Sequence, residues 1–116
     1  MTPTLCLRLA AVSGFLAVAL GAFGAHSLKP LLMQHQTVDI WEKAVFYHTF
    51  HTLVLLFLAT RSTVPKVAVV GILLGIALFS GSLYLLAATN MRWLGAITPL
   101  GGVSFLIGWV WIFLLA

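Results

Sequence analysis

The chain has 116 residues, of which 62% are hydrophobic and 7% charged, and its mean hydropathy is +1.15. A soluble domain of this size cannot bury so much apolar surface, because small domains bury only a modest fraction of their area. The net charge of +4 does not indicate nucleic-acid binding, since every basic residue falls near the end of an apolar run, where lipid headgroups and topology account for it. The composition therefore predicts an integral membrane protein.

Apolar runs of about 20 residues follow one another along the chain, each long enough to cross a ~30 Å hydrocarbon core. They cover roughly 5–25, 40–59, 67–88 and 93–116. The first run follows a basic residue and ends in small residues, as a signal peptide does, but we interpret it as the first span. The pattern predicts an all-α integral membrane four-helix bundle with short loops, forming a single transmembrane domain over residues 1–116.

The predicted loops carry most of the helix-boundary signals. The first loop, about 26–39, is the longest and is apolar enough to lie on the membrane surface. Asp39 and Glu42 have the spacing of a capping pair at the start of the second helix. Thr98 and Pro99 either begin the fourth helix or kink it, and both alternatives stay open.

Polar side chains cluster in the membrane half that faces the first and third loops. With a rise of 1.5 Å per residue, His48 lies roughly 10 Å and His51 roughly 15 Å below the start of the second helix. At 100° per residue, Tyr47 shares a face with both histidines. The candidate pocket residues in this half are His48, His51, Tyr47, Ser80, Tyr84 and Thr98, with His26 near the surface.

Small residues recur at helical spacing in every predicted helix except the second. Such faces let helix backbones approach closely in a membrane. These contacts form within a monomer or between copies, so a homo-oligomer stays open. The glycines predicted to pack helices are Gly21, Gly24, Gly71, Gly75, Gly101 and Gly108.

Several blocks of the sequence carry a family resemblance. They are GAFGAH at 21–26, FHTL at 50–53, LFSGSLY at 78–84 and TPLGGVSFLIGW at 98–109. In this order they resemble the uncharacterised small membrane-protein family labelled domain of unknown function 423, the YgdD/YwdK-like proteins. The resemblance implies a multi-pass protein of the cell inner (plasma) membrane with four spans and no assigned activity. The basic C-terminal tail of many relatives implies cytoplasmic termini, whereas the basic residues of this chain tie three to three across the membrane.

Two interpretations of the buried histidines are compatible with the pattern. In the first, a non-enzymatic protein uses the polar residues, nearby aromatic rings and glycines as a pocket for a membrane lipid or small amphiphile. In the second, both histidines are neutral and only join helices, at around 0.6 kcal/mol per hydrogen bond. We predict a non-enzymatic membrane protein whose polar pocket holds a small amphiphile or lipid, or simply fixes the bundle.

The alternatives are a small proton-coupled transporter and a metal, haem or quinone redox protein using His48 and His51. An imidazole titrates near neutral pH, but such transport usually uses a membrane-embedded carboxylate, which the polar half lacks. A metal site lacks a third ligand at this depth, and a haem between two histidines needs them on opposite faces. Hydrolysis by Ser80 lacks a carboxylate to orient an imidazole. We therefore predict no catalytic residue, no metal and no cofactor.

Overall fold

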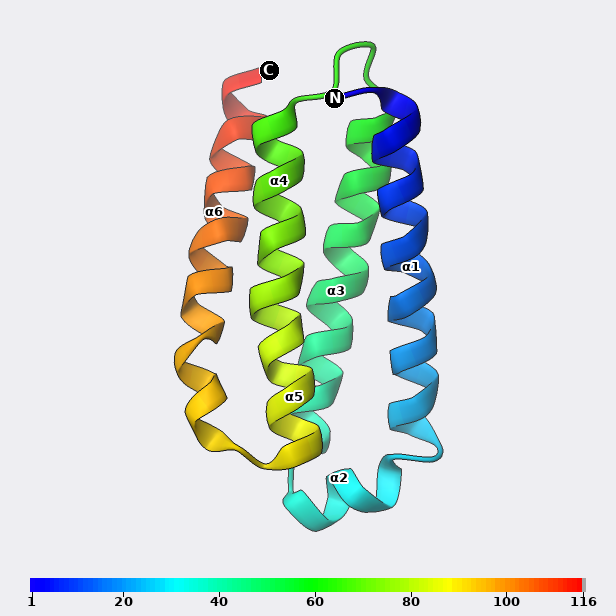
Figure 1. Ribbon diagram of the computed structural model, residues 1–116, viewed down its shortest axis with the longest axis vertical. Helices are drawn as coiled ribbons and strands as arrows, with labels where there is room; N and C mark the ends of the chain where they lie inside the picture. Colours follow the sequence, from blue (N-terminus) through cyan, green and yellow to red (C-terminus); the bar gives the residue numbers. More distant parts are fainter. Residues whose placement is uncertain (116) are drawn as a thin grey trace.

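The computed structural model describes residues 1–115, and over this range every regular element is helical. The long helices run side by side along the molecule, and one short helix crosses its end (Figure 1). The prediction of an all-α fold is confirmed. In chain order the elements are α1 (Pro3–Ala25), α2 (Lys29–His35), α3 (Val38–Ala59), α4 (Lys66–Gly75), the π-helix η1 (Ile76–Ser80), α5 (Gly81–Thr89), the 3-10 helix η2 (Arg92–Ala96) and α6 (Thr98–Leu115).

Three helical stretches are long and apolar enough to cross a membrane, namely Pro3–Ala25, Lys66–Thr89 and Arg92–Leu115. They match three of the predicted spans, although the end of the last, at Ala116, lies outside the described residues. The remaining long helix, α3, does not reach the same apolar content. Its first two turns carry charged residues, and its middle carries both histidines of the predicted pocket.

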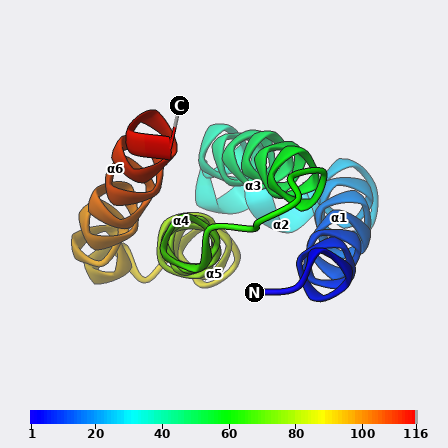
Figure 2. The same cartoon turned by 90° about the horizontal axis from the view of Figure 1, so that it is seen from above.

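The long helices form a zigzag when the molecule is seen from above (Figure 2). α1 packs on α3, α3 packs on η1 and α5, and α4 together with η1 packs on α6. α3 and α6 therefore both flank the α4–α5 rod without packing closely on each other. This arrangement leaves room between α3 and α6 that side chains line but do not fill.

Glycines set the close approach of α6 to the α4–α5 rod. A methyl group at Gly101 would lie on the backbone of Phe79, and one at Gly71 would meet the backbone of Gly108. Gly75 leaves room for the ring of Phe105. Four of the six glycines predicted to pack helices therefore lie at this one interface. The other two, Gly21 and Gly24, face α3 side chains from α1.

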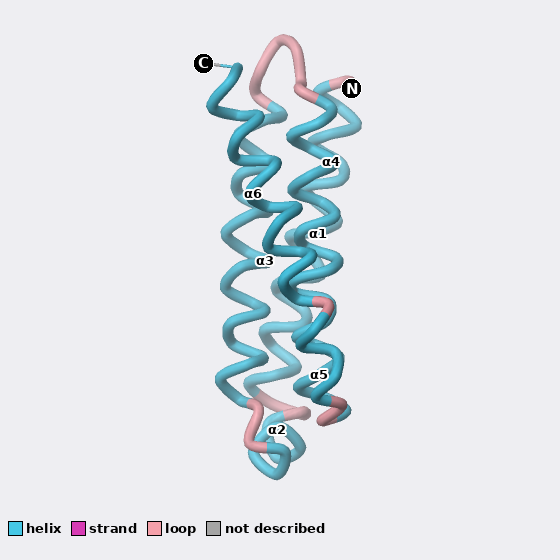
Figure 3. The backbone as a smooth tube through the Cα atoms, turned by 90° about the vertical axis from the view of Figure 1, so that its left-hand side faces the viewer, coloured by secondary structure: helices cyan, strands magenta, loops and turns pink. Residues whose placement is uncertain are grey.

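The end of the molecule near α2 differs from the prediction for the first loop. α2 lies across the ends of the long helices (Figure 3), with Pro30 in its first turn and Gln36 in the left-handed conformation after its last. Thr37 is fully buried, and its hydroxyl donates to the carbonyl oxygen of Ala87 at 2.7 Å. The Nη2 group of Arg92 donates to the carbonyl oxygen of His35 at 3.2 Å. These bonds tie the α2 segment to the end of α5 and to η2.

Two helix-boundary predictions are decided by the structure. The predicted capping pair of Asp39 and Glu42 is wrong, because Thr37 precedes α3 and Asp39 already lies in its first turn. The Thr37 hydroxyl has its acceptors outside α3, so no side chain caps this helix. Thr98 and Pro99 begin α6, where a proline costs no backbone hydrogen bond.

The two neighbouring glycines of α6 provide a matched test of this packing. We expect Gly101→Ala to lower the free energy of unfolding by about 1–3 kcal/mol, because the rigid backbone of Phe79 occupies the space of the new methyl group. Gly102 has open space around the same position, so Gly102→Ala should be neutral or stabilise by up to about 1 kcal/mol. Unfolding of both variants in detergent measures the difference, and equal stabilities would contradict the packing described here.

Candidate functional site

His48 is buried at the centre of a hydrogen-bond chain that joins three helices. Its Nδ1 atom lies 2.9 Å from the hydroxyl of Tyr84 on α5, and its Nε2 atom lies 3.1 Å from the hydroxyl of Ser13 on α1. Ser13 in turn lies 2.6 Å from the hydroxyl of Thr52, one turn after His48 on α3. The Thr52 hydroxyl donates to the carbonyl oxygen of His48 at 2.8 Å.

The direction of every bond in this chain follows from its last member. Because Thr52 uses its proton on a carbonyl, it must accept from Ser13, and Ser13 must then accept from Nε2 of His48. His48 is therefore the neutral Nε2–H tautomer, and its Nδ1 atom accepts the proton of Tyr84. Within residues 1–115 no buried side-chain nitrogen or oxygen lacks a partner. This hydrogen-bond chain therefore leaves none of its polar atoms without a partner and joins α1, α3 and α5.

His51 belongs to a different environment, although it lies only one turn further along α3. The indole Nε1–H of Trp109 on α6 donates to its Nε2 atom at 3.2 Å. An indole can only donate, so His51 is the neutral Nδ1–H tautomer and donates to the carbonyl oxygen of Tyr47 at 2.9 Å. Its ring stacks on Phe105 with centroids 3.7 Å apart. The two histidines are therefore fixed in opposite tautomers.

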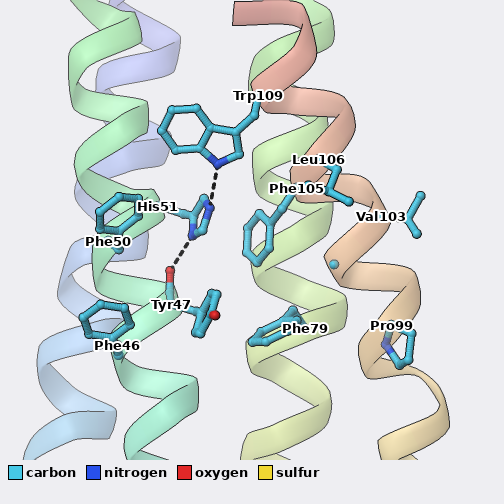
Figure 4. Close-up of a pocket in the computed structure, with 11 residues that line it drawn as sticks. Phe46, Tyr47, Phe50, His51, Phe79, Pro99, Val103, Phe105, Leu106 and Trp109 are labelled. Carbon is cyan, nitrogen blue, oxygen red and sulfur yellow. Dashed lines mark hydrogen bonds between the residues drawn. The ribbon is translucent and has the colours of Figure 1, made fainter.

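An aromatic cavity of about 580 Å³ lies beside His51, between α3 and α6 (Figure 4). α3 contributes the residues on the left of that view, α6 those on the right, and η1 contributes Phe79 below. The ring of Tyr47 is 4.5 Å from that of Phe79, centroid to centroid, and no hydrogen bond joins the Tyr47 hydroxyl to the other cavity residues drawn in Figure 4. The lining residues are Phe46, Tyr47, Phe50, His51, Phe79, Pro99, Gly102, Val103, Phe105, Leu106 and Trp109.

The structure does not gather the seven predicted pocket residues in one place. Tyr47 and His51 line the cavity, whereas His48 and Tyr84 belong to the buried chain. The other three lie apart from both sites. Ser80 donates to the carbonyl oxygen of Ala44, Thr98 pairs with the hydroxyl of Ser82, and His26 is exposed near a carbonyl of its own helix end.

The aromatic partners of His51 are the functional candidates that sequence reasoning missed. Phe79, Phe105 and Trp109 build most of the wall around its ring. An aromatic residue in an apolar span carries no signal that separates a cavity wall from a lipid-facing side chain. Only the block TPLGGVSFLIGW marked this part of α6, through the family resemblance.

The arrangement limits what either histidine can do chemically. All four ring nitrogens have hydrogen-bond partners, so a metal ion or a proton on the accepting nitrogen would have to displace Tyr84 or Trp109. Across the described part of the chain, no three His, Cys, Asp or Glu residues are placed to hold a metal ion. The geometry is that of a structural hydrogen-bond chain next to an apolar cavity.

The sequence of the chain is similar to a family of known membrane proteins. The family model described as "Protein of unknown function (DUF423)" matches residues 20–102. The UPF0382 membrane protein YwdK of Bacillus subtilis (strain 168) is 47% identical over 110 residues, 90% of this chain and 89% of the relative. The UPF0382 inner membrane protein YgdD of Escherichia coli (strain K12) is 44% identical over 115 residues, 94% of this chain and 86% of the relative. No solved structure matches the chain.

The hydrogen bonds around His48 lead to a specific prediction for stability. Ser13→Ala removes both the acceptor of His48 Nε2–H and the donor to Thr52, so we expect a loss of about 1 kcal/mol. Tyr84→Phe removes the donor to Nδ1 at the other side of the same ring, and the two changes should couple by at least about 0.5 kcal/mol. Unfolding in detergent of the two single variants and of the double variant measures both the losses and the coupling.

The control for these variants is Ser62→Ala in the exposed loop between α3 and α4, which should leave the free energy of unfolding unchanged. If the losses from Ser13→Ala and Tyr84→Phe simply add in the double variant, that result would contradict one hydrogen-bond chain running through His48.

Proposed function

The chain belongs to the DUF423 family of UPF0382 membrane proteins, and we propose that its aromatic cavity between α3 and α6 binds the apolar part of a membrane lipid or small amphiphile. In this proposal the protein is a four-span bundle without enzymatic activity. The cavity itself is the observation that carries the proposal. It is lined by six Phe, Tyr and Trp rings together with the imidazole of His51, whose two nitrogens already bond to other residues of the wall.

The first step of the proposal is that α3 also crosses the membrane, in addition to the three apolar stretches Pro3–Ala25, Lys66–Thr89 and Arg92–Leu115. α3 has 22 residues and a length of roughly 33 Å, which suffices for a ~30 Å hydrocarbon core. Three polar side chains in its middle support this assignment because they are buried within the protein. His48, His51 and Thr52 are each 4% exposed, and each has hydrogen-bond partners within the protein.

The second step concerns the shape and access of the cavity. Its deep wall is formed by Phe105, which is 4% exposed, and its rim by Phe46 and Leu106, each 64% exposed. A molecule can therefore enter sideways from the hydrocarbon without crossing a polar barrier. The bond from Trp109 to His51 holds two walls of the cavity at a fixed distance, which limits the cost of ordering side chains on binding.

The third step concerns the polar end of the ligand. The Tyr47 hydroxyl is the polar group of the cavity that Figure 4 shows without a hydrogen bond to its other residues. It lies toward the α2 end of the molecule, closer to the headgroup region than His51. A ligand with an apolar body and one hydrogen-bonding group toward that end satisfies both features.

The proposed location follows from the relatives. The Escherichia coli relative is named an inner membrane protein, and we assign this chain to the same type of membrane. The start of α1 and the end of α6 lie at the same end of the molecule, as four spans require. We assign that end to the cytoplasm, following the family resemblance.

Native mass spectrometry of the protein released from membranes in mild detergent tests the proposal. We expect a discrete additional mass of lipid or amphiphile on the unchanged chain. Gly102→Leu places a side chain in open space at the cavity and should remove that mass while the fold is kept. Val110→Leu is the matched control, because Val110 is lipid-facing on the same helix and does not line the cavity.

Two results would contradict the proposal. One is an unmodified mass for the unchanged chain under conditions that preserve lipid on other membrane proteins. The other is an additional mass that survives Gly102→Leu to the same extent as Val110→Leu.

A further inference from the structure

A second hollow lies on roughly the opposite face of α3, along its seam with α1. It has a volume of about 620 Å³, and a smaller cavity of about 170 Å³ continues it toward α2. Gly21 and Val45 line both, so the two hollows are neighbours, and together they are here called the α1–α3 groove. None of its α3 residues lines the aromatic cavity. A ligand in this groove is therefore independent of the proposed function.

The walls of the groove suit a hydrocarbon chain. The α1 side is made largely of alanine and glycine, and α3 contributes Val45, Thr49, Thr52, Leu53 and Leu56, with the Thr52 hydroxyl already bonded to the His48 carbonyl. From Val45 to Leu56 the groove extends roughly 16 Å along the helix, close to the ~15 Å that one leaflet contributes to a bilayer core. An acyl chain that starts at the α2 end thus has an apolar channel as deep as its own leaflet.

The α2 end of the groove carries one charge of each sign. Lys29 is the first residue of α2, Glu42 lies in the second turn of α3, and both line the smaller cavity. Lys29 is half-buried and Glu42 is exposed, and both lie at the α2 end of the groove. Trp41 also lines this smaller cavity, and its indole Nε1–H donates to the carbonyl oxygen of Leu20.

We infer that the α1–α3 groove binds a phospholipid whose headgroup carries both a phosphate and a primary ammonium group. The Lys29 ammonium faces the phosphate, the Glu42 carboxylate accepts from the primary ammonium, and one acyl chain follows the groove. An anionic headgroup without an ammonium satisfies Lys29 but is repelled by Glu42. A choline headgroup has the charge but no N–H to donate.

Competition between three lipids tests this inference. The protein is incorporated into vesicles of equal parts dioleoyl phosphatidylethanolamine, phosphatidylcholine and phosphatidylglycerol, released into mild detergent and analysed by native mass spectrometry. We expect retained phosphatidylethanolamine to exceed phosphatidylglycerol by about five-fold, the effect of one favourable charge at a membrane surface. Equal retention of the three lipids would overturn the inference.

Charge variants separate the two contacts. Glu42→Gln should bring the ratio of phosphatidylethanolamine to phosphatidylglycerol close to one, because the repulsion and the hydrogen bond to ammonium are both lost. Lys29→Gln should lower the retention of all three lipids, since each carries a phosphate. Both side chains lie at the surface end of the groove, and an unchanged unfolding curve shows that the fold is kept. An unchanged preference in Glu42→Gln would overturn the inference.

Variants within the groove separate a lipid from a second copy of the chain. Ala11→Phe fills the groove, whereas Val12→Phe places the same side chain on the neighbouring lipid-facing position outside it. We expect Ala11→Phe alone to lose the retained phosphatidylethanolamine, and Gly102→Leu to keep it. A dimer that Ala11→Phe converts to monomer, with lipid retention unchanged, would show instead that the groove is an interface between copies.

Discussion

In the proposed four-span bundle the structure depends on one constraint: a membrane interior supplies no water to satisfy the polar groups of α3. An unsatisfied polar group there costs several kcal/mol, so each must find a partner on another helix or on its own backbone. The polar groups of α3 meet this constraint through partners on several neighbouring helices. His48 turns to α1 and α5, Ser80 reaches the α3 backbone from η1, and His51 turns to α6. The position of α3 between its neighbours follows from these bonds as much as from apolar packing.

The same constraint separates the two histidines. Three residues on a helix differ by about 60° in direction, which is enough to place the two rings toward different neighbours. His48 must donate through Nε2 because Thr52 and Ser13 pass their protons in one direction, whereas His51 must accept through Nε2 because an indole only donates. The hydrogen-bond partners therefore dictate opposite tautomers one turn apart on α3. His48 belongs to the buried hydrogen-bond chain, whereas His51 belongs to the wall of the aromatic cavity.

The positions of the long helices were predictable from the sequence, because the length of an apolar run is a local property set by membrane thickness. The pocket was predictable only in part. Helical periodicity put Tyr47, His48 and His51 on one face of α3, but it contains no information about which helix lies opposite each residue. The π-turn of η1 was also out of reach, since it lies where Gly75 and Gly101 let α6 approach the backbone of Phe79. Aromatic walls such as Phe105 and Trp109 looked like ordinary residues of a span.

α3 has a hollow on its side toward α6 and another on its side toward α1, and the two differ in their linings. Toward α6, aromatic rings hold the helices apart and leave a wide cavity with a phenol as its free polar group. Toward α1, small residues leave a narrow groove that ends between a lysine and a glutamate. The amphiphile of the proposed function would lie in the first, and the proposed acyl chain below a zwitterionic headgroup would lie in the second. The hydrogen bonds through His48 join α1, α3 and α5 between the two hollows. Thr52, which belongs to these bonds, also lines the groove toward α1, whereas no member of the hydrogen-bond chain lines the aromatic cavity, so only a ligand in the groove would touch the buried chain.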